Sequence, residues 1–519
     1  MSLKSEVYGL LNNASRLCKD CPEADQLLAT LTQMKRRLET PLRVAVVGIM
    51  KAGKSTFMNA LMGADILYTG DLETTYTVGW FQYGDKPSIT VCFRDGSKTE
   101  APFEDLQKWS VRAYEKENPK INDVKYLIIH YPSEVLKQLE FIDTPGLNSV
   151  YGTDAQNTMD FLALKGSEDT LYEASMADAV IYAFNRTMAG YDKDILDAFH
   201  NGGGMASSPI NSLGILTKVD MGGIWDIFSE NTPVEAASAV TSNIMKNPDI
   251  KNLLFSVFPV CAKVMEGFVQ LSDTDWETLL QISKADPEDL IDMLSDALTF
   301  STCGEDMYME LGRADARKRL VDLIGQYGIL ELAAQLRAGT KREDIGDILN
   351  EKCGIHAIKD ILVSHFGNRT FLIKTRYIFN NIRSVVRQIQ KSGTAGRQML
   401  SICEQIVENI DDLMSSVQTL KELKVLQMYY NGQLRFMDEE ERQDFLRVTG
   451  EYGRSPEVRL GMAKGSTIKA LEQTAKDKVA LWHGKASGFM LPGTYVEAAS
   501  ILARSYEQMY YYLNALVEE

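Results

Sequence analysis

The chain contains no run of about 18 consecutive apolar residues, so nothing in it predicts a membrane-spanning helix. It also has no low-complexity tract, and no charged-then-apolar start, so we expect no cleaved leader. Cysteine is scarce: 7 are scattered over 519 residues, which favours reduced thiols and a cytoplasmic location over a disulfide framework. Cys18 and Cys21 form a C-x-x-C pair, but no second pair accompanies them. Two thiols near a helical turn are therefore favoured over a zinc or redox site.

Positive charge is also in short supply. The 55 Lys and Arg residues are outnumbered by 71 Asp and Glu, which gives a formal net charge of −16. This balance argues against a nucleic-acid backbone or an anionic bilayer as the partner of the bulk surface. The remaining composition, 45% hydrophobic and 24% charged, is that of an ordinary globular protein. The length is sufficient for two or three domains.

One stretch, residues 44–56, carries the strongest signal. Val44–Val47 reads as a buried strand of a parallel sheet, and the pattern G-x-x-x-x-G-K-[ST] follows it directly. In that pattern glycines let backbone N–H groups converge on a phosphate, a lysine reaches the β- and γ-phosphates, and a hydroxyl binds Mg²⁺. A helix that begins near Phe57 points its positive end at the same anion. We expect nucleotide contacts from Gly48, Met50, Lys51, Ala52, Gly53, Lys54, Ser55 and Thr56, with Ser55 as a metal ligand.

Two further elements fit a triphosphate with its metal ion. Residues 76–83 and 88–93 read as neighbouring strands, and Thr75, just before them, is a candidate magnesium ligand, with Thr74 as the alternative. The strand 139–143 ends in D-x-x-G, where Asp143 would hold Mg²⁺ and the Gly146 N–H would meet the γ-phosphate.

The base is predicted by two later strand ends. The strand 212–216 runs into Thr217-Lys218-Val219-Asp220, and the Asp220 carboxylate can accept hydrogen bonds from guanine N1–H and its 2-amino group. Adenine offers no such donor pair. The Lys218 stem would pack over the base, and a strand near 258–260 ends in Cys261-Ala262-Lys263, whose Ala262 N–H could reach guanine O6. Together these elements, in this order, predict a guanine-nucleotide site.

The motifs resemble those of the dynamin superfamily of large GTPases, in particular the bacterial dynamin-like proteins. The likeness rests on residues 48–56, on Thr75 with the Tyr83-Gly84 pair, on residues 143–146 and on Thr217–Asp220, where small GTPases usually begin with Asn. Beyond these, residues 327–332 and 353–362 resemble the helices that close the GTPase domain in this group, and 365–369 leads into the stalk.

The resemblance implies an α/β P-loop GTPase domain, with a mostly parallel sheet and helices on both faces, plus an α-helical stalk. It implies a magnesium-dependent GTPase that binds GTP and GDP, pairs with itself through its GTPase domain, and remodels a membrane or an assembly. Partners would be a second copy, a membrane surface met peripherally, or another dynamin-like protein, and no nucleic acid. The alternative is a regulatory GTPase switch that docks a protein partner through its helical bundle without remodelling anything.

Two departures affect catalysis. Glu73 stands where the family pattern has proline, and Met50-Lys51 stands where eukaryotic dynamins have a Gln-Ser pair. Leu147 follows Gly146, where a small GTPase places its water-orienting glutamine, and an apolar side chain cannot do that work. We therefore name Lys51, Lys54, Thr75 and Gly146 as catalytic candidates. For Lys51, which occupies the place of the arginine finger of guanylate-binding relatives, the alternative is a solvated loop lysine.

Helical periodicity fills the rest of the chain. Residues 265–350 read as a helical insertion, and apolar stripes run through residues 370–391 and 397–413, separated by 392–396. We expect 5–38, 370–440 and 494–517 to form one antiparallel bundle. Around 487–494 a small apolar tip is a candidate membrane contact, with a packed turn as the favoured alternative. The expected division is 1–39 as helices of the stalk, 40–368 as the GTPase domain with its insertion, and 369–519 as the stalk.

Overall fold

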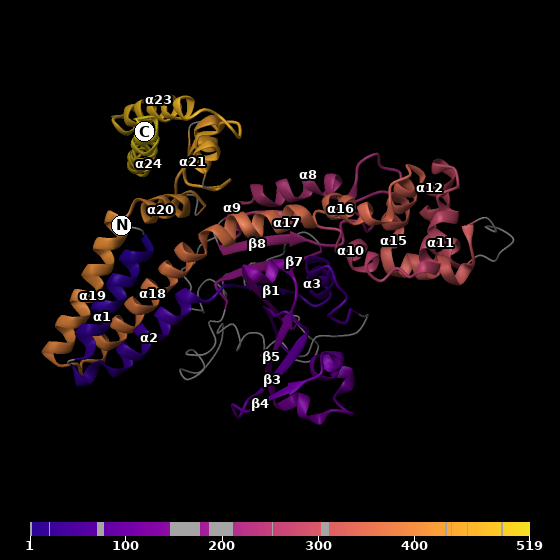
Figure 1. Cartoon of the computed structure of the whole chain (residues 1–519), viewed down its shortest axis with the longest axis horizontal. Helices are drawn as coiled ribbons and strands as arrows, with labels where there is room; N and C mark the ends of the chain where they lie inside the picture. The colour runs from indigo at the N-terminus through magenta and orange to yellow at the C-terminus, as the bar shows by residue number, and fades with distance from the viewer. Residues whose placement is uncertain are drawn as a thin grey trace.

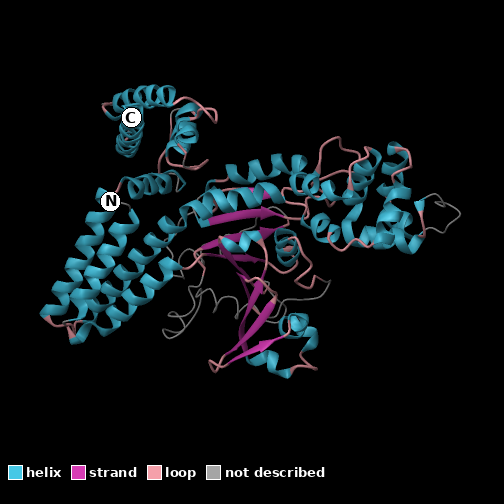
Figure 2. Ribbon diagram, viewed as in Figure 1, coloured by secondary structure: helices cyan, strands magenta, loops and turns pink. Residues whose placement is uncertain are grey.

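The computed structural model describes the chain except for the following residues: 1–2, 20, 70–76, 146–176, 186–210, 252, 303–310, 431–432, 437, 454, 489–490 and 519. In the described part a sheet forms the centre of the molecule, and helices lie around it (Figure 1, Figure 2). Its strands run in the order β4-β3-β5-β2-β6-β1-β7-β8-β9. They are β1 (Leu42–Gly48), β2 (Gly79–Tyr83), β3 (Ser88–Phe93), β4 (Lys98–Ala101), β5 (Val124–Tyr131), β6 (Leu139–Asp143), β7 (Ala179–Phe184), β8 (Ser212–Leu216) and β9 (Val257–Pro259).

The half of the sheet that follows β6 is parallel throughout: β6, β1, β7, β8 and β9 pair in that order. Every residue of β6, β7 and β8 is buried. This is the pattern of strands covered on both faces, and it explains why they read as short, continuous apolar runs. The fold class expected from the sequence, a mostly parallel sheet with helices beside it, is confirmed for this domain.

The expectation that residues 76–83 and 88–93 are neighbours is wrong. β5, which the sequence reading did not identify, lies between β2 and β3, parallel to the first and antiparallel to the second. β2 also pairs antiparallel with β6. The turn after Tyr83 therefore joins two strands, β2 and β3, that have β5 between them in the sheet.

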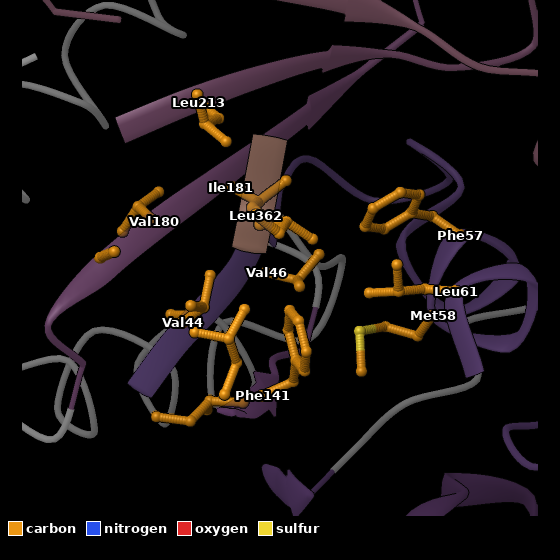
Figure 3. Close-up of a cluster of buried hydrophobic side chains, with 14 of the residues drawn as sticks. Val44, Val46, Phe57, Met58, Leu61, Phe141, Val180, Ile181, Leu213 and Leu362 are labelled. Carbon is orange, nitrogen blue, oxygen red and sulfur yellow. The ribbon is translucent and has the colours of Figure 1, made fainter. Parts of the chain in front are cut away.

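Helix α3 (Lys54–Met62) packs on the sheet directly after the first strand. Its Phe57, Met58 and Leu61 are buried. Figure 3 shows these side chains on the side of Val46 and Phe141, within one hydrophobic cluster. Gly63, in the left-handed conformation at φ 71°, ends the helix.

Of the remaining helices beside the sheet, α4 precedes β5 and the others follow β8. Capping boxes begin two of them, at Thr232 with Glu235 and at Ser272 with Asp275. Helix α10 packs on α3, and α11, α12 and α15 lie beyond it to one side of the sheet (Figure 1), in the range expected to be a helical insertion. Their bounds are α4 (Leu106–Ser110), α8 (Pro233–Lys246), α9 (Pro248–Lys251), α10 (Ala262–Phe268), α11 (Asp273–Ile282), α12 (Pro287–Ser295), α13 (Ala297–Thr302), α15 (Ala314–Arg337), α16 (Arg342–Lys352) and α17 (Ile355–Ile361), followed by a π-helix at Leu362–Gly367.

Two separate helical groups complete the chain. In the first, the N-terminal pair α1 (Leu3–Lys19) and α2 (Asp25–Glu39) packs with α18 (Asn368–Ser392) and α19 (Arg397–Ser416) (Figure 1). The break expected at 392–396 is confirmed. The second group has its own hydrophobic cluster and consists of α20 (Gln418–Tyr430), α21 (Glu439–Val448), α22 (Pro456–Leu460), α23 (Ile468–Ala486) and α24 (Gly493–Glu518).

The expectation of one bundle that includes residues 494–517 is therefore wrong. α24 packs mainly on α23, with Leu502 and Tyr506 in the second cluster and Trp482 of α23 fully buried beside them. Tyr512, expected on the apolar stripe, is 59% exposed. Of the candidate membrane tip, Phe489 and Met490 lie outside the described residues. A search of the described helices finds none whose length and apolar character suit a membrane span.

Candidate functional site: a guanine-nucleotide site at the carboxyl end of the sheet

The phosphate loop bends where its two glycines stand. Gly48 ends β1 at φ 156°, and a Cβ there would lie 2.2 Å from the carbonyl oxygen of Ala183 in β7. Gly53 adopts φ 82°, in the left-handed region, immediately before α3. A side chain at Gly48 would collide with the neighbouring strand, and one at Gly53 would be strained, so both positions require glycine. The loop is thus pressed against the sheet with the start of α3 beside it.

Lys54 is buried at the first position of α3. Its Nζ donates to the carbonyl oxygens of Gly48, at 3.2 Å, and Ile49, at 3.1 Å. Burial lowers the pKa of Lys54 to about 8, and the charge of Asp143 opposes that shift. The ammonium is therefore held inside the loop by carbonyl groups, whose place phosphate oxygens can take at little cost.

Asp143 ends β6 beside Val46 of β1 and is also buried. Among the described residues no side chain donates a hydrogen bond to its carboxylate oxygens. Burial raises the pKa of Asp143 to about 7, although the charge of Lys54 and the backbone of Thr144 oppose the rise. A carboxylate in the interior with so few donors is costly unless something binds it. Together with the Ser55 hydroxyl, Asp143 fits a magnesium site completed by phosphate oxygens and water. The described residues contain no cluster of three or more acidic, histidine or cysteine ligands, which such a site does not need.

Thr217 ties the base-reading motif to the phosphate loop. Its Oγ1 donates to the carbonyl oxygen of Ala52 at 2.6 Å and lies 3.1 Å from that of Phe184. Its N–H donates to the same Phe184 carbonyl at 2.8 Å. The Thr217 hydroxyl thus connects the segment after β8 to the phosphate loop at Ala52.

Asp220 lies half-buried beyond the end of β8, and burial raises the pKa of its carboxyl group, against the charges of Lys263 and Lys218. Lys218 has a left-handed backbone, at φ 56°. A non-helical residue inside α15, Gly325, comes close: a Cβ there would lie 3.8 Å from Asp220 Oδ2. The carboxylate is therefore bordered by the returning helix of the insertion on one side.

The third base element, Cys261-Ala262-Lys263, caps and begins α10. The Cys261 N–H donates to the carbonyl oxygen of Cys353 at 3.0 Å, and burial together with the Cys353 thiol raises the pKa of the Cys261 thiol. Ala262 is buried and Lys263 is exposed. Since β8 and β9 are parallel neighbours, this loop and Thr217–Asp220 emerge at the same edge of the sheet as the phosphate loop.

The remaining candidates stand as follows. Lys51 is exposed and has a left-handed backbone at φ 60°, while Met50 is half-buried and Thr56 lies within α3. Thr74, Thr75, Gly146 and Leu147 lie outside the described residues. The roles proposed for these side chains stay predictions.

Two residues beside the site were missed by sequence reasoning. Asn59 of α3 and Glu266 of α10 are buried and hydrogen-bonded to one another, with 2.7 Å between Asn59 Nδ2 and Glu266 Oε1. The available signal was an asparagine inside the otherwise apolar run Phe57–Met62. A buried polar residue in such a run needs a partner.

Comparisons with known proteins give the following similarities. The family model described as "Dynamin family" matches residues 44–193. The isoniazid-induced protein IniC of Mycobacterium tuberculosis is 24% identical over 477 residues, covering 91% of this chain and 91% of IniC. The bacterial dynamin-like protein of Nostoc punctiforme is 32% identical over 126 residues, or 22% of this chain and 18% of that protein. A solved structure of an oligomerised bacterial dynamin pair aligns with a TM-score of 0.35 and 12% identity, over 98% of this chain and 90% of the other.

Proposed function

We propose, from the premise that this chain belongs to the dynamin superfamily and is a GTPase, that it hydrolyses GTP to GDP and phosphate. We further propose that it couples nucleotide-dependent self-association to the remodelling of a membrane or an assembly. The observation that best supports hydrolysis is the buried carboxylate of Asp143 beside the buried ammonium of Lys54, with no side-chain hydrogen bond to that carboxylate among the described residues. A protein that only used this fold as a scaffold would have no reason to retain that costly pair.

In this proposal each side chain has a definite task. Lys54 would exchange the carbonyl oxygens of Gly48 and Ile49 for phosphate oxygens, and it would neutralise charge that the backbone loop alone cannot. Ser55 and Asp143 would hold Mg²⁺, which when bound stabilises charge on the phosphates. Thr217 would keep the loop in place, and Asp220 would accept hydrogen bonds from guanine. Thr75 and Gly146 keep their proposed contacts with the metal ion and the γ-phosphate.

The helical groups would transmit the nucleotide state. We propose residues 40–368 as the GTPase domain, and residues 1–39 with 369–519 as a stalk built from the two helical groups. The bundle joins the sheet through a buried ion-pair network at Asp178, which directly precedes β7, at the opposite end of the parallel strands from the proposed nucleotide site. Action at a membrane surface rests on family membership and not on a particular lipid-binding residue.

One experiment tests both parts. The rate of GTP hydrolysis per molecule is measured against protein concentration, with and without liposomes. Lys54→Ala serves as the control for contaminating activity. Turnover that rises with concentration, and rises further on liposomes, is the expected result. Slow, flat turnover would contradict coupling to self-association and favour a regulatory switch. Turnover equal in wild type and Lys54→Ala would contradict the site itself.

A further inference from the structure

Helices α3 and α10, which begin at the proposed phosphate-binding and base-binding segments, are joined through the buried Glu266. We propose that Glu266 is a positioning residue that fixes the base-reading end of α10 against the phosphate-binding helix α3, so that guanine and the phosphates are bound in a single register. The inference rests on the proposed guanine-nucleotide site. It adds a residue that contacts no nucleotide but determines how strictly the base is selected.

Glu266 lies one turn into α10, the helix that begins at Ala262 of the base-reading loop. Its side chain is almost fully buried, with 6% of the residue exposed. Oε1 accepts hydrogen bonds from Asn59 Nδ2 at 2.7 Å and from Thr69 Oγ1 at 3.0 Å, and the Thr56 side chain is a further hydrogen-bond partner. Thr56 follows Ser55 directly, so this carboxylate contacts the first turns of the helix that carries Lys54 and Ser55.

Asn59 has a fixed orientation in this contact. Its Oδ1 accepts the backbone N–H groups of Ile66, at 3.1 Å, and Leu67, at 2.8 Å. Its Nδ2 donates to the carbonyl oxygen of Leu67, at 2.8 Å, as well as to Glu266. Because Oδ1 is occupied by two backbone donors, only the amide NH₂ can face α10, and an acceptor is required there. The pair is therefore a directional link and not a packing contact.

α10 is itself held firmly on its other side. A Cβ on Gly267, the residue after Glu266, would lie 2.2 Å from the carbonyl oxygen of Leu323 in α15. The backbone of α15 thus touches the backbone of α10 one residue from the acid. With α15 on one side and Asn59 on the other, α10 and its base-reading end cannot shift relative to α3 without breaking the Asn59–Glu266 bond.

An apolar residue at this place would pack without the cost of burying a carboxylate. Glu266 has no ion pair among the described residues, and its neighbour Asp65 adds a like charge. Its compensation comes from an amide and hydroxyl groups on α3 and from Thr69. Hydrogen bonds from neutral donors to a charged acceptor are stronger than those to a neutral one. Stronger bonds at Glu266 would hold α10 at a fixed distance from α3.

The test compares the affinities of two nucleotides. Inosine diphosphate (IDP) lacks the 2-amino group that Asp220 is proposed to bind, so the ratio of its dissociation constant to that of GDP measures how strongly that group is recognised. Calorimetry on the full chain with Mg²⁺ gives this ratio for wild type and for Glu266→Gln, which keeps the shape but replaces the charged acceptor. We expect the ratio to fall about fivefold in Glu266→Gln, because the amide oxygen still accepts from Asn59 but without the charge that strengthens the bond. Glu277→Gln, the same change at an exposed position of α11, should leave it unchanged.

A second variant tests the direct link. Asn59→Asp places two carboxylates together and also removes the donor to the carbonyl oxygen of Leu67, so it should lower the ratio. If Glu266→Gln does not fold, Glu266→Asp, which keeps the charge and shortens the reach, is measured in its place. Equal weakening of GDP and IDP would indicate a merely structural role and overturn the inference, as would an unchanged ratio in Glu266→Gln or in Asn59→Asp. A wild-type chain that binds GDP and IDP equally would instead overturn the proposed guanine site.

Discussion

Thr217 Oγ1 lies 2.6 Å from the carbonyl oxygen of Ala52, although 165 positions separate the two residues in the chain. Both groups are buried, so the hydroxyl is the partner that an interior carbonyl needs. Through this bond the strand that leads to Asp220 supports the loop that leads to Lys54. The two segments proposed to bind the base and the phosphates are thus connected at two places, here and at Glu266.

Thr217→Val should weaken nucleotide binding. Valine matches the shape of threonine but leaves the Ala52 carbonyl without its donor, which costs about 1–3 kcal/mol. We expect the GDP dissociation constant to rise about tenfold. Thr217→Ser, which keeps the hydroxyl, is the matched control and should stay near wild type. Calorimetry of both variants checks this, and equal GDP affinity in Thr217→Val and Thr217→Ser would contradict it.

Asp220→Asn should change the preferred base from guanine to xanthine. The asparagine amide donates where the carboxylate only accepted, and xanthine presents a carbonyl oxygen where guanine has its 2-amino group. We expect GDP affinity to fall by at least about tenfold and xanthosine diphosphate affinity to rise. Glu230→Gln, an exposed change nearby, is the control. A variant that still prefers GDP would show that Asp220 does not read the base.

Asp178→Asn should destabilise the joint between the bundle and the sheet. The buried Asp178 accepts from Arg37 Nη2 at 2.7 Å and from the Arg43 N–H at 3.0 Å, and the Lys374 ammonium lies 3.7 Å away. The amide would leave two buried cations without their counter-charge, at a cost of about 3–5 kcal/mol. Urea unfolding measures this. Asp411→Asn removes an exposed partner of Arg383 on the same bundle and should cost about 0–1 kcal/mol; equal effects of the two changes would contradict the assignment.

The same carboxylate predicts a pH dependence. Burial by itself would raise the pKa of Asp178, but Arg37 and Lys374 outweigh it and hold the pKa below its usual value. A group whose pKa is lowered by folding stabilises the fold above its unfolded pKa, about 3.9, and loses that contribution as the pH falls through the folded value. Burial lowers the pKa of Lys374 to about 8 and Asp178 opposes that shift, so the carboxyl group is tested only at acid pH, where Lys374 is charged. The difference in unfolding free energy between wild type and Asp178→Asn should shrink as the pH falls below 4. A difference that grows below pH 4 would contradict this.

The parts that the sequence predicts well are those in which short-range chemistry dictates the structure. Gly48 and Asp143 stand at strand ends and Lys54 at the start of α3, as their motifs require, and the buried apolar run 212–216 forms the strand that was expected. The position of β5 depended on which strands pair across the sheet, which is a tertiary choice. α24 packs on α23 and not in the expected bundle. Helical periodicity predicts that one face of a helix is buried, but it does not predict which other helix covers that face. The Asn59–Glu266 bond joins residues 207 positions apart, and no local pattern marks it.

Lys51 provides the last prediction, which concerns cleavage of the γ-phosphate. It is exposed, and its backbone is in the left-handed region at φ 60°, a strained conformation for a residue with a Cβ. Strain of this kind persists where the surroundings fix it, and here the phosphate loop does so. An ammonium on this loop acts on the phosphates only when it leaves water, which requires a closed site of low dielectric. A second GTPase domain placed across the nucleotide would provide that closure.

We therefore expect GDP with aluminium fluoride to dimerise the chain, as measured by light scattering. Lys51→Ala should lower the turnover number about a hundredfold while GTP affinity stays nearly constant. Alanine keeps a Cβ, so the backbone strain at φ 60° is retained and only the ammonium is lost. Lys51→Arg, which keeps a cation at the same position, is the matched control and should retain most of the turnover. Unchanged turnover in Lys51→Ala would indicate that Lys51 is a solvated loop lysine without a role in cleavage. A chain that stays monomeric with the mimic at high concentration would remove pairing from the mechanism, because no other element described here would exclude water from Lys51.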